Sequence, residues 1–335
     1  MKEIKTTKAR KEQQDVIYKG GNFSYSFDEN WGSLPQGLDN LPFVTGCCDE
    51  NEIYLITRDS HNPIIVLDSD GKYLRSMGAG LCEWLHCIRV TPNNTLMCVD
   101  SNCHILREFS KEGELLRNIG SGQPSASGHD PNVWFNRMKR GDVVPMNIAY
   151  DPYWAFAESI STIQCAAPPF NRPTAVDFNS KGEMFCSDGY GNAAVHKFSP
   201  EHELVKTWGG PGKEPGKFLV PHGIRVDKRD RVWVADREGS SVHVFDEEGD
   251  LIYYFSPETV MQPSEIWSDD DYIYIGERGG ITIVNMDMEI EAQLGYFYSP
   301  LMVHGLFGDN RNNLYITNLG LPVSYNHLRR LKRIK

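Results

Sequence analysis

The chain has 335 residues, of which 40% are hydrophobic and 24% charged, so it is long and apolar enough to bury a large core. Its formal net charge of −11 argues against a surface that binds nucleic-acid phosphates, and the basic ending HLRRLKRIK is interpreted as a solvated last strand and tail. No stretch approaches the roughly 18 apolar residues of a membrane-spanning helix. We therefore expect neither a nucleic acid nor a membrane as partner.

The eight cysteines are scattered along the chain, and no CxxC pair suggests a redox or metal motif. The N-terminal stretch MKEIKTTKARKEQQD is polar and lacks the apolar core of a secretory signal. These features predict reduced thiols and a cytoplasmic location.

In chain order, the first predicted strand lies in VIYKGGNFSYSF, at residues 16–27. Units of four short strands follow, each alternating apolar segments with polar turns. The clearest is VPHGIRVDKRDRVWVADREGSSVHVFDEEGDLIYYF (220–255), in which DKRD and EEGD are turns and no helical periodicity is present. Copies of this pattern, some weaker, begin near residues 41, 84, 171, 219, 262 and 301.

A four-stranded unit that repeats about every 40 residues is typical of a β-propeller blade. We predict an all-β, six-bladed β-propeller, with four-stranded antiparallel blades around a central channel, in a single domain over residues 1–335. The segment 16–27 would close the ring. An insertion at 121–170, rich in Trp, Tyr and Phe, would be a lid or substrate wall, a dimer contact, or packing against the blade rim.

Histidines recur at one position of the repeat. The aligned residues are spaced 43, 88, 48, 42 and 40 apart, and they are Phe43, His86, Thr174, His222, Ser264 and His304. Since equivalent residues lie at the same height around the channel, the three histidines would sit on alternate blades and face one axis. Three imidazoles with an open fourth position form the ligand set of a catalytic zinc, although another divalent transition metal would also fit. The alternative is three ordinary channel histidines that bind water or backbone carbonyls.

Several motifs resemble peptidyl-α-hydroxyglycine α-amidating lyase, an enzyme family of NHL-type six-bladed propellers. They are SDGYGN (187–192), TWGG and PGKFLVPHGIRV (within 207–226) and VADRE (234–238), and the resemblance covers most of blades two to four. It implies zinc on His86, His222 and His304. An aspartate that helps to hold calcium in that family is replaced here by Gly305, so calcium is doubtful.

The resemblance also implies roles for four further residues. Tyr190 would be the base that takes the substrate hydroxyl proton, and Arg237 would bind near the substrate carboxylate. Met302 would line the site, and Arg58 would be the counterpart of an arginine from the first blade. The chemistry is coherent, because a metal polarises a substrate oxygen and the planar guanidinium fork of an arginine suits a carboxylate.

Three functions remain open from the sequence. The preferred hypothesis is a metal-dependent lyase that cleaves a small, hydroxylated, carbinolamide-like substrate carrying a carboxylate. The first alternative is a metal-dependent hydrolase of a lactone, ester or amide on the same propeller. The second is a non-catalytic NHL-type binding module. The sequence predicts neither the substrate's identity nor the oligomeric state.

Overall fold

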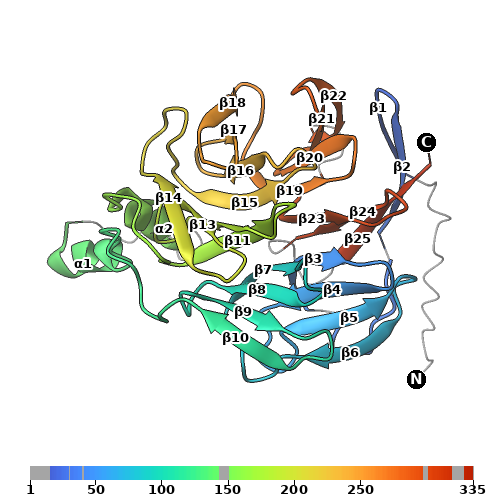
Figure 1. The fold of residues 1–335 in the computed structure, drawn as a ribbon, viewed down its shortest axis with the longest axis horizontal. Coiled ribbons are helices and arrows are strands. Elements are labelled where there is room, and N and C mark those ends of the chain that lie inside the picture. The colour runs from blue at the N-terminus through green and yellow to red at the C-terminus, as the bar shows by residue number, and fades with distance from the viewer. Residues whose placement is uncertain are drawn as a thin grey trace, which may run out of the picture.

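The computed structural model describes residues 16–29, 31–39, 41–142, 151–296, 301–318 and 328–334. Its strands form six separate antiparallel sheets arranged around a centre (Figure 1). This arrangement confirms the predicted six-bladed β-propeller. Within the described ranges, no helix is long and apolar enough to cross a membrane.

Five sheets contain four strands each, numbered outward from the channel in chain order. Sheet one holds β3 (Phe43–Cys48), β4 (Glu52–Thr57), β5 (Ile64–Asp68) and β6 (Tyr73–Met77), and sheet two holds β7 (Leu85–Val90), β8 (Leu96–Asp100), β9 (Ile105–Phe109) and β10 (Leu115–Ile119). Sheet three holds β11 (Pro173–Phe178), β12 (Met184–Asp188), β13 (Ala194–Phe198) and β14 (Leu204–Gly209). Sheet four holds β15 (Pro221–Val226), β16 (Val232–Asp236), β17 (Ser241–Phe245) and β18 (Leu251–Phe255). Sheet five holds β19 (Pro263–Ser268), β20 (Tyr272–Glu277), β21 (Gly280–Asn285) and β22 (Ile290–Gly295).

The sixth sheet joins the two ends of the chain. Its order is β1-β2-β25-β24-β23, so the N-terminal strands lie outside the C-terminal ones. Antiparallel pairing of β2 with β25, from Tyr25 opposite Arg333 to Asp28 opposite Arg330, holds the ends together. The first strand of each sheet contacts that of the next, and β23 contacts β3, so the ring is closed. The five strands are β1 (Ile17–Gly20), β2 (Phe23–Asp28), β23 (Gly305–Gly308), β24 (Leu314–Thr317) and β25 (Leu328–Arg333).

Aspartate-capped turns explain why the strands end where they do. In the DKRD turn, the Asp227 Oδ1 atom accepts hydrogen bonds from the backbone N–H groups of Arg229 (2.8 Å) and Arg231 (3.1 Å). Asp269 does the same for Asp271 and Tyr272 in sheet five. Such side-chain bonds satisfy backbone donors that a tight turn leaves without strand partners.

The core lies between the sheets, because the inner strands are buried on both faces. All five residues of β16 (VWVAD) are buried, whereas the outer strand β18 (LIYYF) exposes its first three residues. Large side chains such as Trp233, Phe185 and Phe245 are buried in clusters that combine residues of neighbouring blades. Packing of sheet against sheet therefore makes a rigid frame for the residues at the channel mouth.

The insertion contains two helices, which the sequence reading did not anticipate. They are α1 (Val133–Arg140) and α2 (Asp151–Ser161), and α1 projects from the rim of the ring (Figure 1). The two helices are joined by an ion pair between Arg137 and Glu158.

Candidate active site at the channel mouth

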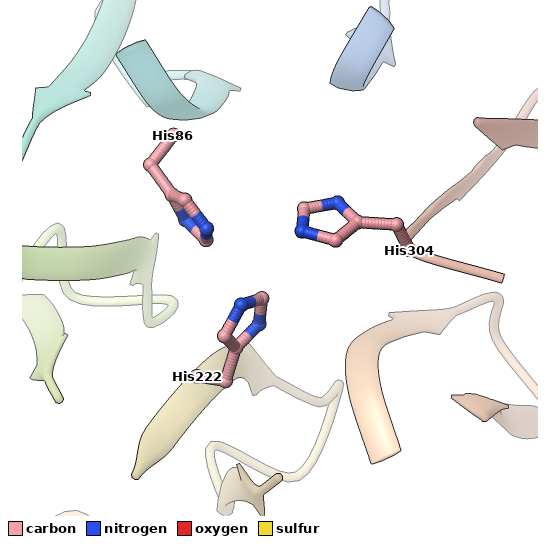
Figure 2. A group of neighbouring side chains, drawn as sticks. All are labelled: His86, His222 and His304. Carbon is pink, nitrogen blue, oxygen red and sulfur yellow. The ribbon is translucent and has the colours of Figure 1, made fainter. Parts of the chain in front are cut away.

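The three aligned histidines meet on the channel axis. His86 is the second residue of β7, His222 is the second residue of β15, and His304 directly precedes β23. Figure 2 shows the three rings pointing toward one another from three separate blades. One ring nitrogen from each lies within 4.8 Å of the other two.

Backbone carbonyls of the intervening blades hold each histidine ring. The Nδ1–H groups of His86, His222 and His304 donate to the carbonyl oxygens of Thr174 (2.7 Å), Ser264 (2.6 Å) and Val44 (3.0 Å). A carbonyl can only accept, so Nδ1 carries the proton and each Nε2 presents a lone pair. Thr174 and Ser264 occupy the aligned position of the repeat in blades three and five. Blades that supply an imidazole therefore alternate around the ring with blades that supply the supporting carbonyl.

The environment keeps these imidazoles neutral. Burial holds the pKa of His86 and of His222 well below 6.5, and burial lowers the pKa of His304 to about 4. Nearby cations, including Arg237, act in the same direction on all three. Neutral imidazole is the form that binds a metal ion.

The Tyr190 hydroxyl lies between two of the histidines. Its oxygen is 2.9 Å from Nε2 of His86 and 2.9 Å from Nε2 of His222. The hydroxyl has one proton, so it can donate to only one of these lone pairs. The second contact therefore joins two acceptors, which is unfavourable unless a cation lies among them.

These residues fit a divalent transition metal. Three neutral Nε2 atoms converge within 4.8 Å of one another, and their Nδ1–H groups are fixed by carbonyls. Three imidazole nitrogens are a ligand set that zinc takes in proteins, so His86, His222 and His304 would hold such an ion. The backbone carbonyls supply the outer hydrogen bonds that such ligands require.

Arg237 contacts the tyrosine from the fourth blade. Its Nη1 atom donates to the Tyr190 hydroxyl oxygen at 3.1 Å, and its Nε atom pairs with Glu238 at 2.8 Å. Burial opposes the charge of the guanidinium, but Tyr190 and Glu238 together raise the pKa of Arg237. Arg237 therefore remains positively charged, and it lies beside the Tyr190 hydroxyl that is predicted to act as base.

Arg58 and Met302 also lie at this mouth. The Arg58 guanidinium stacks 3.9 Å from the centre of the Trp84 ring, and its buried Nε atom has no hydrogen-bond partner among the described residues. Burial lowers the pKa of Arg58, whose charge acts on both His86 and His304. Met302 lines a pocket of about 250 Å³ that also reaches His304 and Arg237.

Two residues of the insertion reach the same mouth. The Phe156 ring of α2 packs edge-on against the Tyr190 ring, with 5.9 Å between centres, and lies 5.6 Å from the Arg237 guanidinium carbon. Tyr153, one turn earlier on α2, lines the pocket beside His304. The aromatic composition of the insertion was the available signal for these contacts, but it could not assign individual residues.

Arg172 is a further cation that the sequence analysis missed. Its guanidinium carbon lies 5.7 Å from the centre of the Tyr190 ring, and its Nη2 atom donates to Asn102 at 3.2 Å. The backbone has a positive φ of 64° at Arg172, and its N–H donates to Nδ1 of His104. The pattern NRPT carried no signal that separated this arginine from an ordinary blade-edge residue.

A buried ion pair closes the channel beyond the histidines. Arg89, three residues after His86, donates to Glu265 at 2.9 Å, and Thr45 donates to the other carboxylate oxygen at 3.3 Å. These groups come from blades two, five and one, so they bridge the channel. A larger pocket of about 640 Å³ lies at the opposite mouth among Asp49, Asp269 and other acidic residues, and no predicted site residue lines it. The histidine site is therefore approached from the side that bears α2.

Gly305 leaves no room for an aspartate, the residue that the resemblance to the amidating lyases implies at this position. A Cβ atom there would lie 2.5 Å from the carbonyl oxygen of Val44 and 2.4 Å from Oγ1 of Thr317. The Val44 carbonyl is the group that holds the His304 ring. An aspartate at this position would displace the support of a histidine.

The remaining cysteines and histidines stand apart from this cluster. All eight cysteines are free thiols. His61 is at the surface, and His327 lies outside the described residues. The other five histidines have hydrogen bonds or a carboxylate neighbour elsewhere: His104, His129, His196, His202 and His243.

Comparisons with known proteins agree with the fold and the motifs. A family model described as "NHL repeat" matches residues 218–245. Human NHL repeat-containing protein 3 is 33% identical over 243 residues, which cover 70% of this chain and 60% of that protein. Mouse peptidyl-glycine alpha-amidating monooxygenase is 38% identical over 191 residues, which cover 54% of this chain and 16% of that protein. Peptidyl-alpha-hydroxyglycine alpha-amidating lyase 1 of Drosophila melanogaster is 33% identical over 85 residues, 23% of this chain and 16% of that protein.

Solved structures share the fold at low sequence identity. A streptogramin B lyase superimposes with a TM-score of 0.57 at 12% identity, over 92% of this chain and 98% of that one. A gluconolactonase from Xanthomonas campestris gives 0.57 at 10% identity, over 96% and 99% of the two chains.

The fold and the site define a six-bladed β-propeller with a three-histidine channel mouth. By sequence, the chain carries an NHL repeat and is related to amidating lyases and to NHL repeat-containing protein 3, which confirms the resemblance seen in the motifs. The chain spans between 16% and 60% of the length of these three relatives.

Proposed function

We propose that this protein is a zinc-dependent lyase that cleaves a small carbinolamide bearing a carboxylate. The observation that carries the proposal is the position of the Tyr190 hydroxyl, 2.9 Å from two inward-facing histidine nitrogens and 3.1 Å from Arg237. A metal-binding group, a proton acceptor and a carboxylate-binding cation are thus adjacent. Amidating lyases among the relatives support this reaction class.

His86, His222 and His304 would hold the zinc, which supplies Lewis-acid polarisation of a substrate oxygen. Tyr190 would take the proton of the substrate hydroxyl while the carbon–nitrogen bond breaks. The hydroxyl carbon then becomes an aldehyde, and the departing amide nitrogen takes up the proton that Tyr190 accepted from the hydroxyl, so that the tyrosine returns to its starting state. Arg237 would hold the substrate carboxylate, and its Nη1–H group would orient the Tyr190 oxygen through the hydrogen bond at 3.1 Å.

Arg58, Met302 and α2 would shape the site around this reaction. Arg58 adds a second positive charge, fixed by stacking on Trp84. Met302 supplies an apolar wall next to His304. The helix α2 would act as the substrate wall, because Phe156 packs against both Tyr190 and Arg237. The free thiols favour a reducing, cytoplasmic location for this chemistry.

Metal content tests the ligand set. Protein purified without an affinity tag should contain nearly one zinc per chain by plasma mass spectrometry, and His222→Ala should lose it. His243→Gln, which alters a buried histidine outside the channel, is the matched control and should retain the metal. A folded wild-type protein that takes up no divalent metal would contradict the proposal and favour a non-catalytic propeller.

Product analysis tests the reaction. With α-hydroxyhippurate, an N-acyl-α-hydroxyglycine, a lyase releases benzamide and glyoxylate. A hydrolase acting on the amide releases benzoate instead. Chromatography of the products therefore separates the two enzyme classes, and benzoate as the main product would replace the lyase by a hydrolase.

A further inference from the structure

The fifth blade places an arginine at the position that Arg237 occupies in the fourth. Arg237 follows Asp236, the last residue of β16, and Arg278 follows Glu277, the last residue of β20. In both blades the buried carboxylate accepts a backbone N–H from the incoming loop: Val220 donates to Asp236 at 2.6 Å, and Met261 donates to Glu277 at 2.6 Å. The two arginines therefore leave equivalent turns at the same mouth.

Arg278 lines the pocket that contains the candidate site. The same pocket of about 250 Å³ is bounded by Arg237, Met302, His304 and the α2 residue Tyr153. The Arg278 Nη1 atom donates to the side-chain oxygen of Gln262 at 3.0 Å, and the Gln262 N–H donates to Ser240 on the Arg237 turn. This chain of contacts links the two arginine turns and orients Arg278.

Charge in the pocket favours an anionic ligand with more than one negative group. Arg237 is paired with Glu238, whereas Arg278 has no carboxylate within ion-pair distance among the described residues. The charged side chains that line the pocket are Arg237, Arg278 and Glu238, which together leave one net positive charge. A protein with a net charge of −11 thus presents a positive pocket at this mouth.

We propose that Arg278 forms a second anion-binding subsite, so that the substrate is a small dianion. One carboxylate lies at Arg237 near the reacting carbon, and the second anionic group lies at Arg278 beside the Tyr153 ring. This inference rests on the proposed function, because it assigns the pocket beside the histidines to the substrate. It specifies the substrate class that the histidine trio and Tyr190 leave open.

Calorimetric titration with simple carboxylates tests the subsite without turnover. The probes are butyrate, which has one carboxylate, and succinate, glutarate and adipate, which have two at increasing separation. In the wild-type protein, the best-fitting dicarboxylate should bind at least about tenfold tighter than butyrate, since a charged hydrogen-bond pair contributes that much. Titrations before and after dialysis against EDTA separate binding at the arginines from chelation of a metal.

Three variants decide whether Arg278 is responsible. Arg278→Gln should bind dicarboxylates and butyrate with similar affinity, and Arg278→Lys should keep part of the preference. Arg311→Gln, at a half-exposed arginine of the opposite mouth, should behave like the wild type. Circular dichroism melts verify that each variant is folded.

The inference is overturned if the wild type binds no dicarboxylate more tightly than butyrate, including the case in which neither binds. It is equally overturned if Arg278→Gln keeps the full preference after EDTA treatment. Either result leaves the zinc and benzamide measurements unaffected, so failure of this subsite is distinguishable from failure of the lyase proposal.

Discussion

At the residue scale, the most informative feature of the site is the number of hydrogen-bond donors and acceptors around the Tyr190 hydroxyl. Three imidazoles direct lone pairs inward because carbonyls hold their Nδ1–H groups. One phenol proton cannot satisfy two of these lone pairs, and Arg237 donates a further hydrogen bond to the phenol oxygen. Such a cluster of inward-facing acceptors favours binding of a cation.

Replacing Tyr190 by Phe tests the role of this hydroxyl. With α-hydroxyhippurate, kcat should fall about 10²- to 10³-fold, because general-base catalysis typically contributes that much. The KM and the zinc content should change little, since the ring and the three histidines remain. Steady-state kinetics and metal analysis on the same preparation measure both effects. An unchanged kcat would remove Tyr190 from the reaction.

At the scale of an element, the fourth blade places one inner-strand residue on the axis and one turn residue at the mouth. In the fourth blade, β15 supplies His222 and the turn after β16 supplies Arg237. The same blade buries His243 between the rings of Phe218 and Tyr254. Its Nδ1 accepts a hydrogen bond from the Gly216 N–H, so its Nε2–H donates to Ser241.

His243 makes the stability of this blade depend on pH. Burial lowers the pKa of His243 from 6.5 to about 4, so the unfolded chain binds the proton more tightly. The stabilising contribution is therefore complete above pH 6.5 and is lost as the pH falls toward 4. Between pH 7 and pH 5, this residue should lower the free energy of unfolding by roughly 2 kcal/mol.

Urea denaturation of the wild type and of His243→Gln at pH 7 and pH 5 measures that contribution. The variant keeps one donor and one acceptor but does not titrate. Its free energy of unfolding should fall by about 2 kcal/mol less than that of the wild type over the same interval. Equal losses in both proteins would mean that His243 is not buried in its neutral form.

At the scale of the whole molecule, stability depends on closing the ring with both ends of the chain. The N-terminal β2 pairs with the C-terminal β25, and Phe23 of β2 packs on Tyr272 and Tyr274 of the fifth blade, with ring centres 4.9 and 6.5 Å away. The Arg333 guanidinium carbon lies 4.5 Å from the Phe23 ring. The closing strand thus joins the sixth blade to the fifth.

Phe23→Ala should therefore lower the free energy of unfolding by about 3–5 kcal/mol, the range for removing a buried phenylalanine. Phe135→Ala, at a half-exposed ring on α1, is the matched control and should change it by less than about 0.5 kcal/mol. Chemical denaturation measures both variants. If Phe23→Ala costs no more than the control, ring closure does not depend on this contact.

The sequence by itself determined the blades and the register of the histidines. Apolar and polar residues alternate along the strands, and turns such as DKRD separate one strand from the next. Both features depend on near neighbours in the chain, so they are visible without tertiary structure. Because the repeat fixes which residue faces the axis, equal positions in different blades identify His86, His222 and His304 as a set. The likeness of SDGY and ADRE to known motifs added Tyr190 and Arg237.

Only the tertiary structure decided which other groups share the mouth. Phe156 meets Arg237 although 81 residues separate them, and Arg172, Arg278 and Tyr153 lie in segments without a recognisable motif. The insertion folds as two helices whose position depends on packing against the blade rim, which no local pattern encodes. Side chains from separate blades converge only once the ring has closed, because closure is a property of all six sheets together.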